Sequence, residues 1–286
     1  MKGNSIRGSR VFKGGGVSPL PLKFVKSHCG GNDFIILDAR EYKLPDNLTP
    51  FVQQITHRHT GIGADGVIVI EPEVHLSDIA DFRVRYFNPD GSEYAVCGDG
   101  SLCVVRYANK DKMHFATEVG IIEGYLSNGK SKVKLIEPKE INLSISLNIG
   151  DKQIEVDFVE FGVPHTVVHI DDVNLIEIDK MAIPIRSNAY FGSQGTNVNF
   201  MQIINKHKIG TRSYERGVEG AVFSCGSGIC ACAVVGWLKG ELVSPVEVKT
   251  RGGDFHILIN GLDEIWLEGE AKIIYTAELM LDKEEK

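Results

Sequence analysis

At 286 residues the chain is long enough for one large or two ordinary domains, and its 43% apolar and 24% charged residues are ordinary for a soluble globular protein. The net charge of -7 argues against a general nucleic-acid or anionic-membrane binder, because such partners demand a basic face. The sequence contains no run of about 18 apolar residues, so it predicts no membrane-spanning helix. We therefore expect a cytoplasmic protein that acts on a small molecule, with no nucleic-acid or membrane partner.

The first 22 residues differ from the rest of the chain. Residues 1–32 contain six Lys and Arg and no Asp or Glu, while the glycines at 14–16 and the prolines Pro19 and Pro21 oppose a continuous amphipathic helix. We interpret residues 1–22 as a flexible N-terminal extension. A weak organelle-targeting signal is the alternative.

The next hundred residues predict strands followed by a helix. FIILDAR (Phe34–Arg40) and GVIVIEP (Gly66–Pro72) are rich in strand-forming residues and are bounded by turn residues. DFRVRYF alternates up to an Asn-Pro-Asp-Gly turn that begins at Asn88. SLCVVRYANK, after Gly100, has helical character.

The remainder repeats this order. Apolar and polar residues alternate in KVKLIEP, INLSISLNIG and QIEVDFVEFG, which is typical of antiparallel strands with one solvent-exposed face. The strand pattern continues in TNVNFMQII (Thr196–Ile204). An Ala- and Cys-rich helix follows Cys225, with Gly240 as its C-cap. Two hairpins with Gly-Gly and Asn-Gly turns close the chain.

An internal match supports a duplication. Cys97 and Cys225 lie 128 positions apart, and each precedes a Gly-x-Gly sequence. The same offset pairs Tyr86 with Tyr214. We predict two strand-rich units, each with a central helix entered through Cys-Gly-x-Gly and related by an approximate two-fold axis, with the two cysteines facing each other across the interdomain cleft.

The six cysteines are interpreted as thiols, because a chain of this length is not a small secreted domain that needs disulfides. Cys103, Cys230 and Cys232 fall inside the predicted helices, where we expect buried packing. Cys29 is ambiguous between a site loop and small-residue packing. A metal site remains an alternative, but the Cys-x4-Cys-x-Cys spacing lacks the usual Cys-x2-Cys pair of zinc sites, and we expect no metal.

Cys-Gly-x-Gly before a helix has a physical use. The glycines expose backbone N–H groups, and the helix N-terminus carries partial positive charge that suits a carboxylate. The same field favours thiolate over thiol, so we expect a cysteine usable as a base near neutral pH. Inversion of a stereocentre by proton transfer requires a base on one face of the carbon and an acid on the other, and two opposed cysteines supply both without a pyridoxal cofactor.

The chain resembles the cofactor-independent diaminopimelate epimerases from about Lys23 to its C-terminus. The motifs that carry the resemblance appear in the family's order: HCGGNDF (28–34), RHTGIGADG (58–66), FRVRYFNPDGSEYAVCGDG (82–100), GVPH (162–165), GTNVNF (195–200) and YERGVEGAVFSCGSGICACA (214–233). Several spaced motifs in order are far more specific than either cysteine motif alone.

The resemblance implies an α+β fold of two pseudo-symmetric domains, each a mainly antiparallel sheet wrapped around a central helix. We place the N-terminal domain at residues 23–139, joined by a C-terminal strand within 272–286, and the C-terminal domain at 140–271. A homodimer is left open, and the expected partner is an amino acid substrate.

The resemblance also implies roles for particular residues. Cys97 and Cys225 become the acid/base pair, and His165 and Glu215 tune their pKa values. The reacting α-carboxylate is assigned to the backbone at Gly98, Asp99, Gly226 and Ser227. The distal end of the substrate is assigned to Asn32, Asn88, Asn197 and Arg216, and its ammonium groups to Glu215. Without the family, Asn88 reads as a turn residue, His165 as a core histidine and Glu215-Arg216 as a surface ion pair.

Four positions, in three motifs, depart from the family's usual text. Val163 stands where Gly-Asn-Pro-His has Asn, Asp99 where Cys-Gly-Asn-Gly has Asn, and Ala221-Val222 where Glu-Thr is common. Asp99 brings a negative charge close to a carboxylate site. The resemblance as a whole implies a diaminopimelate epimerase, which interconverts LL- and meso-diaminopimelate. A racemase of another amino acid, such as histidine, is one alternative, and a non-catalytic binding or metal-site protein on the same fold is the other.

Overall fold

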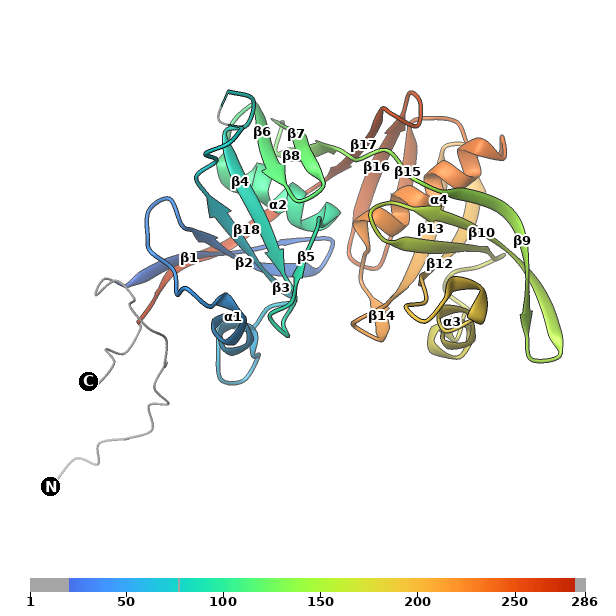
Figure 1. Ribbon diagram of the computed structural model, residues 1–286. Coiled ribbons are helices and arrows are strands. Elements are labelled where there is room, and N and C mark those ends of the chain that lie inside the picture. The colour runs from blue at the N-terminus through green and yellow to red at the C-terminus, as the bar shows by residue number, and fades with distance from the viewer. Residues whose placement is uncertain (1–20, 77, 281–286) are drawn as a thin grey trace, which may run out of the picture.

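The computed structural model describes residues 21–76 and 78–280 (Figure 1). The predicted extension of residues 1–22 lies almost entirely outside this range, and the first strand already begins at Leu22. Two units lie side by side in Figure 1, and the C-terminal strand returns to the unit in which the chain begins.

The first unit has nine strands and two helices. In chain order they are β1 (Leu22–Cys29), β2 (Asn32–Asp38), α1 (Leu48–Thr56), β3 (Gly66–Glu71), β4 (Phe82–Phe87), β5 (Glu93–Tyr94), α2 (Gly98–Ala108), β6 (Lys112–Thr117), β7 (Gly120–Ser127), β8 (Lys130–Lys134) and the returning β18 (Lys272–Leu279).

The second unit repeats this order and adds one short 3-10 helix. Its elements are β9 (Ile141–Ile149), β10 (Lys152–Glu160), β11 (Pro164–His169), α3 (Ile178–Arg186), η1 (Ala189–Phe191), β12 (Asn197–Asn205), β13 (Lys208–Glu215), β14 (Gly220–Val222), α4 (Gly226–Leu238), β15 (Val246–Lys249), β16 (Asp254–Ile259) and β17 (Ile265–Gly269).

Strand pairing is the same in both units. The first unit pairs in the order β18-β1-β2-β3-β4-β6-β7-β8 and the second in the order β9-β10-β11-β12-β13-β15-β16-β17, with β5 beside β4 and β14 beside β13. The parallel pairs β2–β3 and β4–β6 match β11–β12 and β13–β15, and the other pairs are antiparallel. The equivalent strands β8 and β17 pair with each other and join the two units.

Alternate residues of the inner strands enter different cores. Phe34 and Ile36 of β2 pack in a large cluster with α2 and α4, whereas Ile35 and Leu37 face the other way and pack beneath α1. α3 covers a third cluster in the second unit. Since both faces of β2 are buried, its side chains form a continuous apolar run, as expected for a strand with a parallel neighbour.

The central helix of each unit is enclosed by its sheet. α4 is apolar around its whole circumference, and its residues Gly228 to Gly236 are all buried, including Cys230 and Cys232. Cys103 is equally buried in α2. Gly240 follows the end of α4 with a φ of +72°, the conformation that glycine favours just beyond a helix. The predicted α+β class, with mainly antiparallel sheets around central helices, is confirmed.

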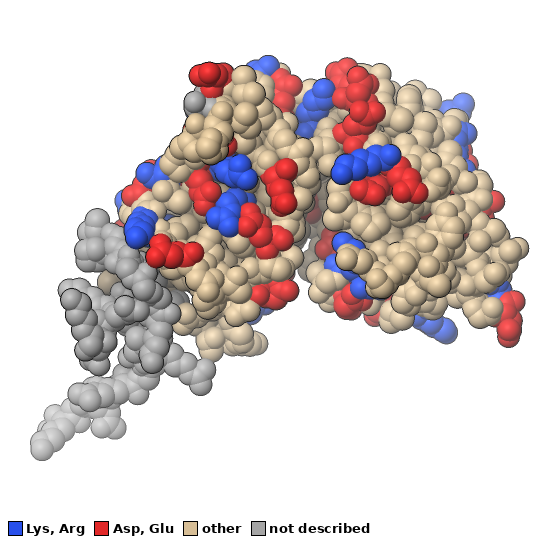
Figure 2. Space-filling model, viewed as in Figure 1, with Lys and Arg blue, Asp and Glu red and all other residues tan. Residues whose placement is uncertain are grey.

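The turns also follow the sequence signals. The amide of Gly91 donates to the carbonyl of Asn88 over 2.9 Å and closes the Asn-Pro-Asp-Gly turn. The Gly-Gly and Asn-Gly turns join β15 to β16 and β16 to β17. On the face drawn in Figure 2, acidic and basic side chains are interspersed over both units. No helix in the described part of the chain has the length and apolar character to cross a membrane.

Candidate active site

Cys97 and Cys225 occupy the same position in the two units. Each is the N-cap of a central helix in extended backbone conformation, with φ of -132° and -138°, and the helix begins at the glycine that follows. The Cys97 sulfur accepts a hydrogen bond from the backbone N–H of Gly100 over 3.3 Å. The Cys225 sulfur lies 3.8 Å from the hydroxyl oxygen of Ser227. Each thiol is therefore set at the positive end of a buried helix.

The two helix N-termini meet each other. A Cβ on Gly98 would lie 3.1 Å from the Cα of Gly226, and a Cβ on Gly226 would lie 2.9 Å from the backbone nitrogen of Asp99. Only glycine permits this approach at both positions. Both cysteines adjoin this contact, which we call the helix junction (residues 97–99 and 225–227), so residues far apart in sequence converge on one place.

The ionisation of the thiols is governed by burial. Burial raises the pKa of Cys97 to about 12, and the Asp99 carboxylate adds to the shift while the Gly100 amide opposes it. Burial and then Glu215 raise the pKa of Cys225 well above its usual value. The expectation of thiolate near neutral pH from the helix field alone is therefore wrong for this structure, because burial and nearby carboxylates outweigh the helix N-termini.

His165 reaches Cys225 through Ser227. The side-chain amide of Asn199 donates to His165 Nδ1 over 3.2 Å, so His165 Nε2 carries the proton and donates to Ser227 Oγ over 2.9 Å. Burial lowers the pKa of His165 to about 3, and Arg216 adds to the shift, which keeps the imidazole neutral. The neutral ring thereby orients the serine hydroxyl beside the thiol.

Two members of this chain of hydrogen bonds, Ser213 and Asn199, are not among the site residues that the sequence predicts. Ser213 donates from its hydroxyl to the Asn199 carbonyl oxygen over 2.8 Å, which fixes the amide so that its nitrogen faces His165. Asn199 lies two residues after Asn197 on β12, and the period of two puts both asparagines on one face of the strand. That alternation in Thr-Asn-Val-Asn-Phe was the available signal.

Glu215 and Arg216 lie at the end of β13, beside the second cysteine. Glu215 is half-buried, and burial raises its pKa while Cys225 acts against that shift. The backbone N–H of Arg216 donates to the side-chain oxygen of buried Asn197 over 2.8 Å, and Arg216 Nη1 donates to Gln194 over 3.2 Å. Arg216 forms no ion pair with a carboxylate of residues 21–76 and 78–280, so its guanidinium is available to an anionic ligand.

The remaining predicted ligands divide into two groups. Asn32 begins β2 and is half-buried, close to Asp99. Asn88 is exposed in its turn, where its amide donates to the Ser92 hydroxyl over 3.1 Å. The structure therefore brings Asn32 to the helix junction, while the amide of Asn88 is engaged in holding the turn. Val163 is half-buried in the short connection before β11.

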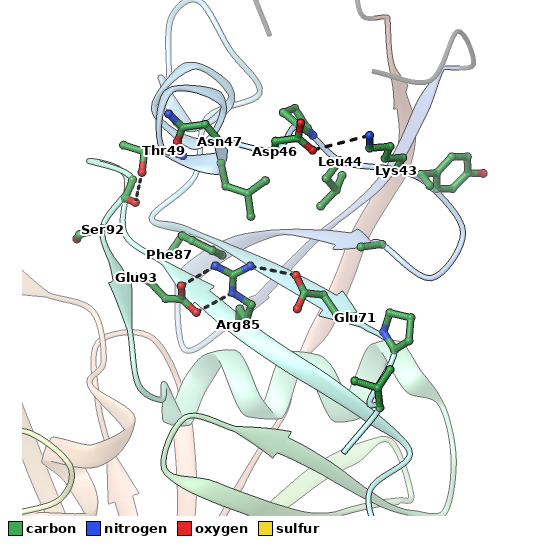
Figure 3. Close-up of a pocket in the computed structure, with 17 residues that line it drawn as sticks. Lys43, Leu44, Asp46, Asn47, Thr49, Glu71, Arg85, Phe87, Ser92 and Glu93 are labelled. Carbon is green, nitrogen blue, oxygen red and sulfur yellow. Dashed lines mark hydrogen bonds and ion pairs between the residues drawn. The ribbon is translucent and has the colours of Figure 1, made fainter. Parts of the chain in front are cut away.

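A cavity of about 800 Å³ lies apart from the cysteines (Figure 3). Arg85 points into it and donates to Glu71 over 3.0 Å and to Glu93 over 2.8 and 2.7 Å. The same guanidinium lies 4.9 Å from the centre of the Phe87 ring. Because two carboxylates surround Arg85 and none of the predicted site residues lines this cavity, the helix junction remains the candidate active site.

Two repeated units, each a sheet around a central helix, form a fold that several solved structures share. A probable proline racemase from Agrobacterium radiobacter K84 has this fold, with a TM-score of 0.70 over 92% of this chain and 94% of the racemase at 15% identity. The family model for diaminopimelate epimerase matches residues 24–141 and 158–274.

Individual relatives agree with the family model. The chain is 38% identical to the diaminopimelate epimerase of Methanocella arvoryzae over 279 residues, which covers 91% of this chain and 98% of the relative. It is 37% identical to the diaminopimelate epimerase of Aquifex aeolicus over 278 residues, which covers 90% and 98%. The chain belongs to the diaminopimelate epimerase family, and the resemblance found in its motifs is confirmed.

Proposed function

We propose that this protein interconverts LL- and meso-2,6-diaminopimelate by moving one α-proton between a thiolate and a thiol, without pyridoxal phosphate. The observation that carries the proposal is the meeting of two helix N-termini, each capped by a cysteine, at Gly98 and Gly226. Membership of the family supplies the substrate. The product would serve lysine and cell-wall precursor synthesis, and we propose a cytoplasmic location.

The proposed chemistry needs a base and an acid on opposite faces of the α-carbon. One cysteine, as thiolate, takes the α-proton, and the other, as thiol, delivers a proton to the opposite face, so the two sulfurs exchange protonation states in each turnover. Backbone N–H groups of both helices bind the α-carboxylate and stabilise the charge that develops next to it. The substrate's ammonium group lowers the raised pKa values of the thiols, because a nearby positive charge favours thiolate.

The far end of the substrate is assigned to the β13 side of the site. Arg216 can hold the distal carboxylate through its guanidinium fork, with Asn197 fixing the backbone of Arg216. Asn32 and Asn88 complete the proposed set, and Glu215 faces the ammonium groups. Ser227 and neutral His165 hold the environment of Cys225 constant during turnover.

Deuterium exchange tests this proposal. In deuterium oxide the wild-type protein should wash label into the α-position of both LL- and meso-diaminopimelate and interconvert them. Cys97→Ser and Cys225→Ser should each abolish inversion, and each should retain exchange with only one stereoisomer, because one thiol faces one side of the carbon. Cys230→Ala, which removes a buried thiol of α4, is the matched control and should keep inversion.

Full inversion by either serine variant would contradict the two-thiol mechanism. Absence of exchange with diaminopimelate, together with exchange of another amino acid, would contradict the substrate. Val163 and Asp99 motivate the same exchange screen across the common amino acids, histidine included. If no amino acid exchanges, the protein is not an enzyme of this kind.

A further inference from the structure

Asp99 is a fully buried carboxyl group at the helix junction. It is the second residue of α2, and none of its surface is exposed. Its Oδ2 accepts a hydrogen bond from the Ser224 hydroxyl over 2.9 Å, which links the start of α2 to the segment before α4. Its Oδ1 is buried and has no hydrogen-bond partner among the residues that the structure describes.

The unpaired oxygen lies against the first residue of the opposite helix. A Cβ on Gly226 would lie 3.0 Å from Asp99 Oδ1, and 2.9 Å from the backbone nitrogen of the same aspartate. A buried carboxylate oxygen without a donor is costly, whereas a neutral carboxylic acid carries an O–H group that suits an acceptor. The side chain is thus placed to present a proton at the proposed carboxylate site.

The ionisable groups around Asp99 favour its neutral form. Glu215 faces it from β13, Cys97 and Cys103 from α2, Cys225 and Cys230 from α4, and Cys29 from β1. Every one of these groups is either neutral or negative. Burial raises the pKa of Asp99 to about 7, the Ser224 hydrogen bond and the nearby Asn32 side chain oppose this shift, and Glu215 adds to it. The carboxyl can therefore gain or lose a proton near neutral pH at little cost.

We propose that Asp99 takes up one proton from solvent when the substrate's α-carboxylate enters the helix junction, and that the neutral acid then donates a hydrogen bond from Oδ1 to that carboxylate. The inference rests on the proposed function and concerns the binding of its substrate. An ionised Asp99 repels the carboxylate, so only the protonated fraction of the protein binds substrate. Asp99 thus makes substrate affinity depend on pH.

Asparagine is the matched variant at this position. Its amide has the shape of the neutral acid and donates a hydrogen bond at every pH, while its oxygen can still accept from Ser224. Asp99→Asn should therefore remove the dependence of substrate affinity on a proton. Ser224→Ala provides a second variant, because loss of its hydrogen bond should move the titration of Asp99 to higher pH.

The first measurement is KM and kcat for LL-diaminopimelate as a function of pH in the wild type and both variants. Wild-type KM should rise roughly 50-fold between about pH 7 and about pH 9, and KM of Asp99→Asn should change by less than about threefold. In Ser224→Ala the rise should begin at higher pH. The thiols give kcat a pH dependence of their own in all three proteins, so KM is the decisive quantity.

The second measurement is the number of protons taken up on binding, from calorimetric titration of meso-diaminopimelate into the protein in buffers of different ionisation enthalpy. At about pH 8 the wild type should take up close to one proton more per bound substrate than Asp99→Asn does, because any proton that the thiols release on binding is common to both proteins. Equal KM profiles and equal proton uptake in the two proteins would overturn the inference while leaving the epimerase proposal intact.

Failure of the proposed function has a different signature. Wild-type protein would then show no deuterium exchange with diaminopimelate. The same calorimetry, with the amino acid that the exchange screen identifies, then decides the inference; if no amino acid binds, the inference fails with the function. Should Asp99→Asn not fold, the shift of the KM profile in Ser224→Ala carries the test, and an unshifted profile refutes it.

Discussion

Replacing Asp99 with Asn should change how the stability of the folded protein depends on pH. Burial holds the pKa of this carboxyl at about 7 in the folded chain, against an ordinary value of 3.8. At a pH between these two pKa values, the Asp99 carboxyl is ionised in the unfolded chain and still protonated in the folded chain. Ionisation therefore favours the unfolded state as pH rises, and the resulting decrease in the free energy of unfolding levels off above about pH 7.

The size of this effect follows from the shift. One pKa unit corresponds to about 1.4 kcal/mol, so the shift from 3.8 to about 7 destabilises the wild type by at most about 4 kcal/mol at high pH. Roughly 2 to 3 kcal/mol of this accumulates between about pH 5 and about pH 8. Asparagine has no proton to lose, so the variant is free of this contribution.

Urea unfolding followed by circular dichroism measures the effect. The free energy of unfolding of Asp99→Asn minus that of the wild type should rise by roughly 2 to 3 kcal/mol from about pH 5 to about pH 8. The new amide leaves an unpaired buried N–H, but that penalty is the same at both pH values and cancels in the comparison. A difference that stays constant with pH, or falls, would show that the carboxyl is ionised in the folded protein and would refute the reasoning.

Two further substitutions test the packing around the site and the fold. Gly98→Ala should lower kcat/KM by roughly 100-fold, because its methyl would meet the Gly226 Cα at 3.1 Å and separate the helices; unchanged kcat/KM would contradict the junction as the site. Lys239→Met should cost about 3 kcal/mol in urea unfolding, because Lys239 Nζ lies 2.9 Å from both oxygens of fully buried Asp157. A cost below about 1 kcal/mol would show that His169 and the backbone N–H of Ser144 suffice to stabilise Asp157.

The repeat, and the position of each cysteine at the start of a central helix, were predictable from local signals. Each cysteine precedes glycines that leave the backbone N–H groups of the first helical turn unobstructed. An offset of 128 positions aligns β4 with the end of β13, and α2 with α4. Turn residues from Asn88 to Gly91 and at Gly240 marked element ends correctly, because glycine, proline and asparagine act on the backbone next to them. Such features depend on a few neighbouring residues.

The chemistry of the site depended on contacts between distant residues. The hydrogen bond from Ser224 to Asp99 and the chain from Ser213 through Asn199 to His165 join segments that no local pattern connects. Burial reversed the expected direction of the thiol pKa shifts, since a helix N-terminus can be read from sequence but the loss of solvent around it cannot.

The ionisation of Asp99 depends both on its local sequence position and on contacts with distant residues. Its sequence position predicts a carboxylate at a helix N-terminus, a place where a negative charge is ordinarily favoured. The fold buries that carboxylate completely, against a second helix and beside Glu215, and raises its pKa to about 7. The local sequence determined that a carboxyl group lies at the start of α2. The packing of the two units against each other determined whether that carboxyl stays ionised, because desolvation depends on every segment that surrounds the group.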